Sequence, residues 1–338
     1  MRKNTKKKTI TTRKNRLSPT GLTIRHILVP MDFSGLSRQA LTCAVPLALK
    51  NLAKISLIHV ANPPVVMRTM PDGGMVMPVI PGNLKEVAKS HLDELAIQLL
   101  PDGLRAWTIV REGNPANEVV AAAKALKADL IVLSSKGRSG ISRMLMGSTA
   151  ERIVRYAHCP VLTVRRQPGG PAMRVLSSAK PLFPEDLPWR RILVPVDLSL
   201  TSLRALQTAV PLAEQSNARL LLLNVVEPNP YATGMEGAVL VMPNEDLVET
   251  ARQQLGGIAK RFVPKSLAST PLVTCGRAAD EIVKTAEEKG VDLIVLSAHG
   301  RTGLERLLMG STAEQVVRQA RCPVLIVRKP KGLKQAGN

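Results

Sequence analysis

The chain has 338 residues, of which 45% are hydrophobic and 22% charged, a balance typical of a globular protein large enough for two domains. Its apolar runs, such as 220–226, are far shorter than the roughly 20 residues that cross a bilayer, so no membrane span is predicted. The four cysteines form no CxxC pair and have no clustered histidines, which argues against a metal site and a disulfide framework.

Residues 1–23 form a basic N-terminal arm. The first 20 residues carry eight Lys and Arg and no acid, within a chain of formal net charge +21. Such a block repels itself and stays solvated, so we predict disorder. Two interpretations stay open: weak contact with nucleic acid or another acidic partner through counterion release, or a solvated tail without a fixed partner. The arm lacks the apolar region of a secretory signal; an organellar transit peptide stays open, and we expect a cytoplasmic protein.

Residues 24–166 alternate short apolar runs with amphipathic segments, among them 36–50 and 84–99. The apolar runs are rich in Leu and β-branched residues and alternate little, as in strands buried on both faces of a parallel sheet. Five such strands with intervening helices predict a doubly wound α/β domain. The predicted strands are His26–Pro30, Ile55–Val60, Ala106–Val110, Leu130–Leu133 and Val161–Val164.

A linker at 167–189, rich in Pro, Gly and Ser, precedes a second copy of this domain at 190–329, and a short tail follows at 330–338. The repeat is direct, because 26–34 recurs as 191–199 and 145–151 recurs as 308–314. A period this long indicates two tandem domains rather than a solenoid. The predicted strands of the second copy are Ile192–Pro195, Leu220–Val225, Pro271–Val273, Leu293–Leu296 and Val324–Val327.

A glycine-containing segment follows the fourth strand of each copy. The first copy has Ser134-Ser135-Lys136-Gly137, nine residues, and then Gly147-Ser148; the second has Ser297-Ala298-His299-Gly300, nine residues, and then Gly310-Ser311. A predicted helix follows each Gly-Ser pair, and the N–H groups and dipole at a helix N-terminus attract anions. We expect the serine hydroxyl to lie at the capping position. The segment therefore predicts a phosphate-binding loop in each copy.

Asp32 and Asp197 end the first strands of the two copies, where a carboxylate can accept hydrogen bonds from ribose hydroxyls. Ligands of open α/β sheets lie at the carboxyl ends of strands, so one crevice collects the aspartate and the phosphate loop. Taken singly, a Gly-Ser cap or an Asp turn is more often structural. The chain has no Walker A sequence and no GxGxxG after its first strand, which excludes a P-loop ATPase and a standard dinucleotide binder.

The arrangement resembles the universal stress protein family, whose ATP-binding members carry G-x2-G-x9-G-(S/T). The resemblance covers 24–166 and 190–329, and it includes Gly113 with Glu118 and Gly276 with Glu281. It implies a Rossmann-like fold that holds ATP, with or without Mg²⁺. In this arrangement Asp32 and Asp197 contact the adenosine, and the backbones of Val60 and Val225 face the adenine. The implied nucleotide-binding residues are Asp32, Val60, Ser134, Gly137, Gly147, Ser148 and Thr149, and Asp197, Val225, Ser297, His299, Gly300, Gly310, Ser311 and Thr312.

Both copies depart from the family pattern at its first glycine, which is Ser134 or Ser297. A serine there either narrows the crevice or adds a hydrogen bond. The second copy keeps His299-Gly300, closer to the ATP-binding form, whereas Lys136 of the first copy either meets phosphate or faces solvent. We therefore expect the second site to bind ATP better.

Three functions follow from these motifs: a nucleotide-binding stress-response protein, which leads, a nucleotide-free interaction protein acting through its basic surface, and a slow ATPase. The absence of HExxH, GxSxG and a telling carboxylate pair argues against dedicated catalysis. The resemblance implies that 161–164 and 324–327 pair the two domains edge to edge, and a homodimer stays open. The Met- and Pro-rich segments 62–82 and 228–243 are a lid, an oligomer contact or disordered loops.

Overall fold

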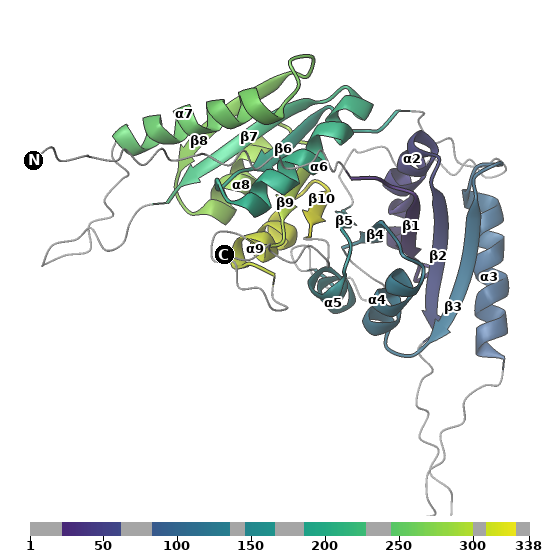
Figure 1. The fold of residues 1–338 in the computed structure, drawn as a ribbon. Helices are drawn as coiled ribbons and strands as arrows, with labels where there is room; N and C mark the ends of the chain where they lie inside the picture. Colours follow the sequence, from purple (N-terminus) through teal and green to yellow (C-terminus); the bar gives the residue numbers. More distant parts are fainter. Residues whose placement is uncertain are drawn as a thin grey trace, which may run out of the picture.

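Two five-stranded parallel sheets join edge to edge into one continuous sheet with helices on both faces (Figure 1). The computed structural model describes residues 22–61, 83–135, 146–165, 186–227, 245–299 and 309–328. The predictions for residues 1–21, for the Met- and Pro-rich segments 62–82 and 228–243, for most of the linker and for the tail lie outside these ranges.

The first half contains the elements β1 (His26–Pro30), α1 (Gly35–Gln39), α2 (Leu41–Asn51), β2 (Lys54–Ala61), α3 (Leu84–Leu99), β3 (Ala106–Glu112), α4 (Pro115–Ala125), β4 (Leu130–Ser134), α5 (Ser148–Tyr156) and β5 (Val161–Val164). The second half contains β6 (Arg191–Pro195), α6 (Leu200–Ser216), β7 (Arg219–Val226), α7 (Glu245–Phe262), β8 (Ser269–Cys275), α8 (Ala278–Glu288), β9 (Leu293–Ser297), α9 (Ser311–Gln319) and β10 (Val324–Val327).

The strand order is β3-β2-β1-β4-β5-β10-β9-β6-β7-β8, and all neighbours within a half are parallel. Each half is therefore doubly wound, and its strand order reverses between β1 and β4 or between β6 and β9. The predicted fold class is confirmed, and each predicted strand overlaps an observed one. Ligands of such sheets bind at the carboxyl ends of the two strands that flank the reversal.

β5 and β10 join the halves as an antiparallel pair, with Leu325 opposite Leu162. The edge-to-edge pairing expected for 161–164 and 324–327 is thereby confirmed within the chain. The pairing covers one edge of each five-stranded sheet, which would otherwise expose unpaired backbone groups. The Thr163 hydroxyl adds a hydrogen bond to the Val324 carbonyl at 3.2 Å.

The hydrophobic core continues across the junction on both faces of the sheet. One cluster lies under α2, α3, α6 and α7, and the other under α4, α5, α8 and α9 (Figure 1). Each cluster contains buried residues of both halves. Leu187 and Trp189, just before β6, are buried in the first cluster. The two halves therefore share their cores instead of folding around separate ones.

One helix departs from its prediction. The segment 36–50 is divided at Ala40 into α1 and α2, whereas α6 is continuous. The Ala40 N–H donates to the carbonyl of Ser37, three residues back, at 3.2 Å. This tight turn interrupts the α-helical hydrogen bonding. Pro46 is not the cause, because α6 carries Pro211 at the matching place without a break.

Within the described ranges, no helix is long and apolar enough to cross a membrane.

Candidate functional site

A strained turn presents the aspartate that follows the first strand of each half. Oδ1 of Asp32 accepts hydrogen bonds from the backbone N–H and the hydroxyl of Ser34, at 3.0 and 2.5 Å. Asp197 and Ser199 repeat both bonds, at 3.1 and 2.6 Å. The intervening residue is left-handed in both copies, with φ of 63° in the first half and 67° in the second. Bulky residues rarely adopt this conformation, so the hydrogen bonds hold a costly turn that fixes the carboxylate.

The residue that precedes each aspartate accepts a hydrogen bond, through its backbone carbonyl, from a side chain of the neighbouring strand. The Met31 carbonyl accepts a hydrogen bond from Nδ1 of His59 on β2, at 2.8 Å. In the second half, Nδ2 of Asn224 donates to the Val196 carbonyl at 2.6 Å. Different side chains thus perform the same task. The predicted adenine-facing residues, Val60 and Val225, follow directly and are half-buried at this edge of the sheet.

One backbone hydrogen bond joins the residues that flank the loop after β4, and the second half repeats this bond after β9. The Ser135 carbonyl accepts from the Gly147 N–H at 2.9 Å, and the Ala298 carbonyl accepts from the Gly310 N–H at 2.8 Å. This bond brings the start of α5 or α9 to the carboxyl end of β4 or β9, beside the strand-order reversal. Gly137 and Gly300 lie outside the described residues, as does Lys136, whose two alternatives stay open.

The glycine, and not the serine, is the N-cap of these helices. Gly147 and Gly310 occupy the capping position with φ near −67° and −61°, and no side chain caps either helix. The expectation that Ser148 and Ser311 cap the helices is wrong, because they are the first helical residues. Their hydroxyls therefore lie one residue further along. The extended backbone at the glycines suits any residue, so what glycine supplies there is the space that a Cβ would fill.

The helix starts offer backbone donors. The first N–H that finds an acceptor within α5 is that of Glu151, which donates to the Gly147 carbonyl at 2.9 Å; Glu314 and Gly310 repeat this at 3.0 Å. The N–H groups of the first three helical residues lack an intrahelical acceptor by geometry. In α5 these include the exposed Ser148 and Thr149; in α9 they include Ser311 and Thr312. Such an N-terminus is suited to an anion.

The serine at the first position of the loop motif makes a local hydrogen bond in the second half. The Ser297 hydroxyl donates to the His299 carbonyl at 2.6 Å. Of the two roles considered for a serine in place of glycine, this contact supports the added hydrogen bond. It holds the loop's first turn in place.

The two halves differ beside the aspartate. In the first half, Phe33 stacks on His91 of α3, with ring centroids 4.3 Å apart, and contacts His59 at 4.2 Å. The second half has the smaller Leu198 in place of Phe33. This aromatic cluster was not predicted from the sequence, because its residues lie on a turn, a strand and a helix that are far apart in the chain. The signal was the Phe-to-Leu difference directly after the repeated aspartate.

A repeated glycine and a buried histidine have structural roles. Gly113 and Gly276, after the third strands, have φ of 130° and 146°. A Cβ on Gly276 would lie 2.9 Å from Cγ of Glu281.

Buried His26 contacts the Ser56 hydroxyl through Nε2 at 2.8 Å, and burial lowers its pKa. In the part of the chain that the structure describes, no three His, Cys, Asp or Glu residues gather as a metal site.

Strand order and site geometry define a tandem protein of the Rossmann-like α/β class. The universal stress protein family model matches residues 23–165 and again 188–328. The chain therefore belongs to the universal stress protein family.

Relatives match both a single half and nearly the whole chain. A universal stress protein of Methanocaldococcus jannaschii is 36% identical over 143 residues, covering 42% of this chain and 84% of the relative. One of Mycolicibacterium smegmatis is 27% identical over 312 residues, covering 89% of this chain and 96% of the relative. The crystal structure of one from Archaeoglobus fulgidus shares the fold, with a TM-score of 0.59 at 20% identity, covering 90% of this chain and 98% of that chain.

Proposed function

We propose that each half binds an adenine nucleotide, ATP, at the carboxyl edge of its sheet, and that the bound state alters the chain's interactions in a stress response. The observation that carries the proposal is the bond from Gly147 to Ser135, repeated from Gly310 to Ala298. It brings a helix start, which attracts anions, to the carboxyl end of the strand that neighbours the aspartate's own strand.

The residues at the edge fit the parts of the nucleotide. The fixed carboxylates of Asp32 and Asp197 suit ribose hydroxyls, which donate hydrogen bonds. The N–H groups at the starts of α5 and α9 suit phosphate oxygens. The absence of a Cβ at Gly147 and Gly310 leaves room for a phosphate beside the helix. When bound, ATP supplies the negative charge that these helix starts attract, and no described residue is assigned to Mg²⁺.

The second site is the tighter one in this proposal. Its loop keeps His299-Gly300, which is closer to the ATP-binding form of the family than the Lys136-Gly137 of the first half. Leu198 beside its aspartate is smaller than the stacked Phe33 of the first half. The two halves would therefore bind ATP with different affinities.

Isothermal titration of the full chain with ATP tests the sites. Asp197→Ala and Gly310→Val should each weaken the tighter binding event by about tenfold or more, since hydrogen bonds to charged groups contribute about 1.5–3 kcal/mol. Asp186→Ala is the matched control, because it removes an exposed carboxylate that lies before β6, at the opposite end of the strands. Gly310→Val is compatible with the extended backbone at that position, so the variant should fold.

Undiminished ATP binding in both variants would contradict the proposal. A complete lack of ATP binding by the unmodified chain would favour the nucleotide-free interaction protein. Salt-dependent binding to nucleic acid that requires residues 1–20 would then support that alternative. Phosphate release above the Gly310→Val background would add slow hydrolysis to binding.

A further inference from the structure

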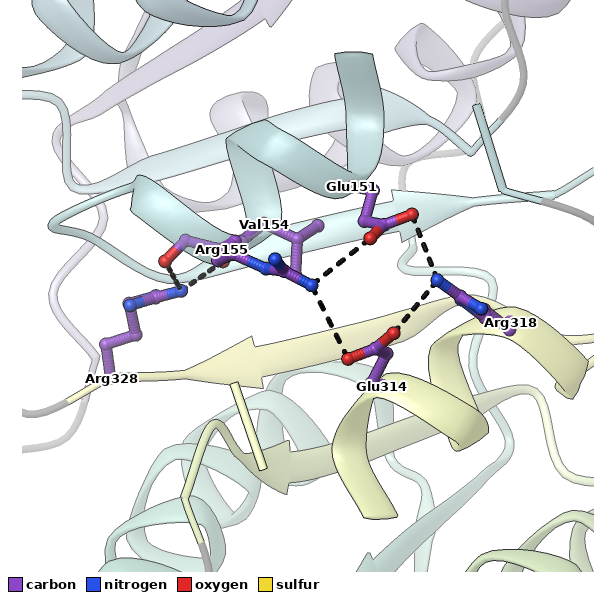
Figure 2. A network of polar contacts seen from close by, with 6 residues as sticks. All are labelled: Glu151, Val154, Arg155, Glu314, Arg318 and Arg328. Carbon is purple, nitrogen blue, oxygen red and sulfur yellow. Dashed lines mark hydrogen bonds and ion pairs between the residues drawn. The ribbon is translucent and has the colours of Figure 1, made fainter. Parts of the chain in front are cut away.

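Four charged side chains close a ring between the two halves, which we call the interdomain ring: Glu151 and Arg155 of α5, and Glu314 and Arg318 of α9 (Figure 2). Arg155 lies 3.2 Å from Glu151 and 3.6 Å from Glu314. Arg318 lies 3.2 Å from Glu151 and 2.9 Å from Glu314. Each arginine thus pairs with the glutamate of its own helix and with that of the other half.

Two more arginines cross the junction at the other ends of the same helices. Arg328, after β10, donates to the carbonyls of Val154 and Arg155 at the end of α5 (Figure 2). Arg165, after β5, donates to the carbonyls of Val317 and Arg318 at the end of α9. A cation stabilises the C-terminal carbonyls of a helix. Each of α5 and α9 is therefore held by the opposite half along its last turns.

These helices are the ones whose starts form the proposed phosphate sites. Glu151 and Glu314 lie in the first helical turn, immediately after the residues that offer their N–H groups. A carboxylate there competes with a phosphate for the same helix dipole and repels it. The ring draws each carboxylate to two guanidinium groups, one from each half. The charge that opposes phosphate binding in one half is thus neutralised partly by the other half.

We propose that Arg155 and Arg318 are positioning residues for both nucleotide sites, so that each site depends on an arginine supplied by the opposite half. This inference rests on the proposed ATP binding. It goes beyond the family fold, because it makes the junction part of both sites. Two independently folded copies that each bound ATP would lack this dependence.

The test measures the first site alone. Gly310→Val closes the second site, so titration of this background with ATP at low ionic strength reports the first half. Adding Arg318→Gln, in the closed half, should weaken the remaining ATP binding about two- to fivefold. Arg318→Lys should restore it, since charge is what matters. Arg252→Gln is the matched control, because it removes an exposed arginine of the same half, paired within its own helix.

Charge repulsion makes a second, sharper prediction. Adding Glu151→Gln to the chain that carries Gly310→Val and Arg318→Gln should restore most of the ATP affinity that Arg318→Gln removes. The reason is that no carboxylate then opposes the phosphate at the first site. The loss should also shrink as salt is raised. A merely structural role of Arg318 would predict neither result. Equal ATP affinities for the Arg318→Gln and Arg252→Gln chains would overturn the inference.

Hydrogen exchange of the α5 amides separates this inference from the proposed function. Without nucleotide, Arg318→Gln should speed exchange in residues 148–156 of the opposite half, and Arg252→Gln should not. If the Gly310→Val chain binds no ATP, the proposed nucleotide binding by the first half is wrong. The exchange result then decides whether Arg318 stabilises α5 of the opposite half. Unchanged exchange would overturn it; faster exchange confined to the Arg318→Gln chain would support it.

Discussion

The shared core predicts that a single cavity at the junction destabilises the whole chain. Leu162 and Leu325 lie opposite each other in the β5–β10 pair, and their side chains are 1% and 2% exposed. Leu162→Ala removes three buried carbons, which costs about 2.4 kcal/mol at about 0.8 kcal/mol per carbon if the neighbours close the gap. A cavity that persists raises the cost toward about 5 kcal/mol. We expect the free energy of unfolding to fall within that range.

Urea denaturation gives the free energy, and calorimetry shows how many transitions occur. Because both core clusters contain residues of both halves, Leu162→Ala should shift one common transition. Leu247→Ala, at a largely exposed leucine of α7, is the matched control and should change the free energy by less than about 0.5 kcal/mol. Two separate transitions, of which only one responds to Leu162→Ala, would refute the inference that the halves share their core.

Two other predictions concern the glycines after the third strands and the buried His26. Gly276→Ala should lower the free energy of unfolding by about 1–3 kcal/mol, and Gly113→Ala should lower it by less. The reason is that only Gly276→Ala brings a Cβ within 2.9 Å of a side chain. The reverse order in urea denaturation would contradict this prediction. Burial lowers the pKa of His26 below 6.5, so the unfolded chain binds its proton first and stability should fall as pH drops below about 6.5. His26→Gln should flatten that pH dependence, and an unchanged slope in urea denaturation would exclude His26 as its source.

Much of the fold was predictable from local patterns. Buried strands such as Leu130–Ser134 are continuous apolar runs, and a direct repeat fixes the number of domains without any structure. Details that depend on single hydrogen bonds were not predictable. The break at Ala40 coincides with one i−3 bond, whereas the matching α6 is continuous, although both helices have the same apolar periodicity. The cap at Gly147 instead of Ser148 is a shift of one residue, within the ordinary error of helix boundaries.

The site was only partly predictable, for a different reason. Repeated motifs identified the aspartates and the helix starts, because these residues are close in sequence to the strands that carry them. The stacking of Phe33 on His91 joins residues of a turn and a distant helix, and in the interdomain ring Arg318 meets Glu151, 167 positions away in the sequence. No spacing rule within one half predicts such contacts. The ring forms because the antiparallel β5–β10 pair brings α5 and α9 together.

The tandem arrangement explains why the two halves differ where they do. A residue of the junction meets its counterpart from the other copy, so Arg155 and Arg318 must serve both halves, and the ring is reciprocal. A residue beside the aspartate meets only its own half. Phe33 and Leu198 can therefore diverge without disturbing the junction, as can His59 and Asn224, which hold the same carbonyl with different groups. Joining two copies in one chain thus allows the two proposed nucleotide sites to differ while the junction between the halves stays reciprocal.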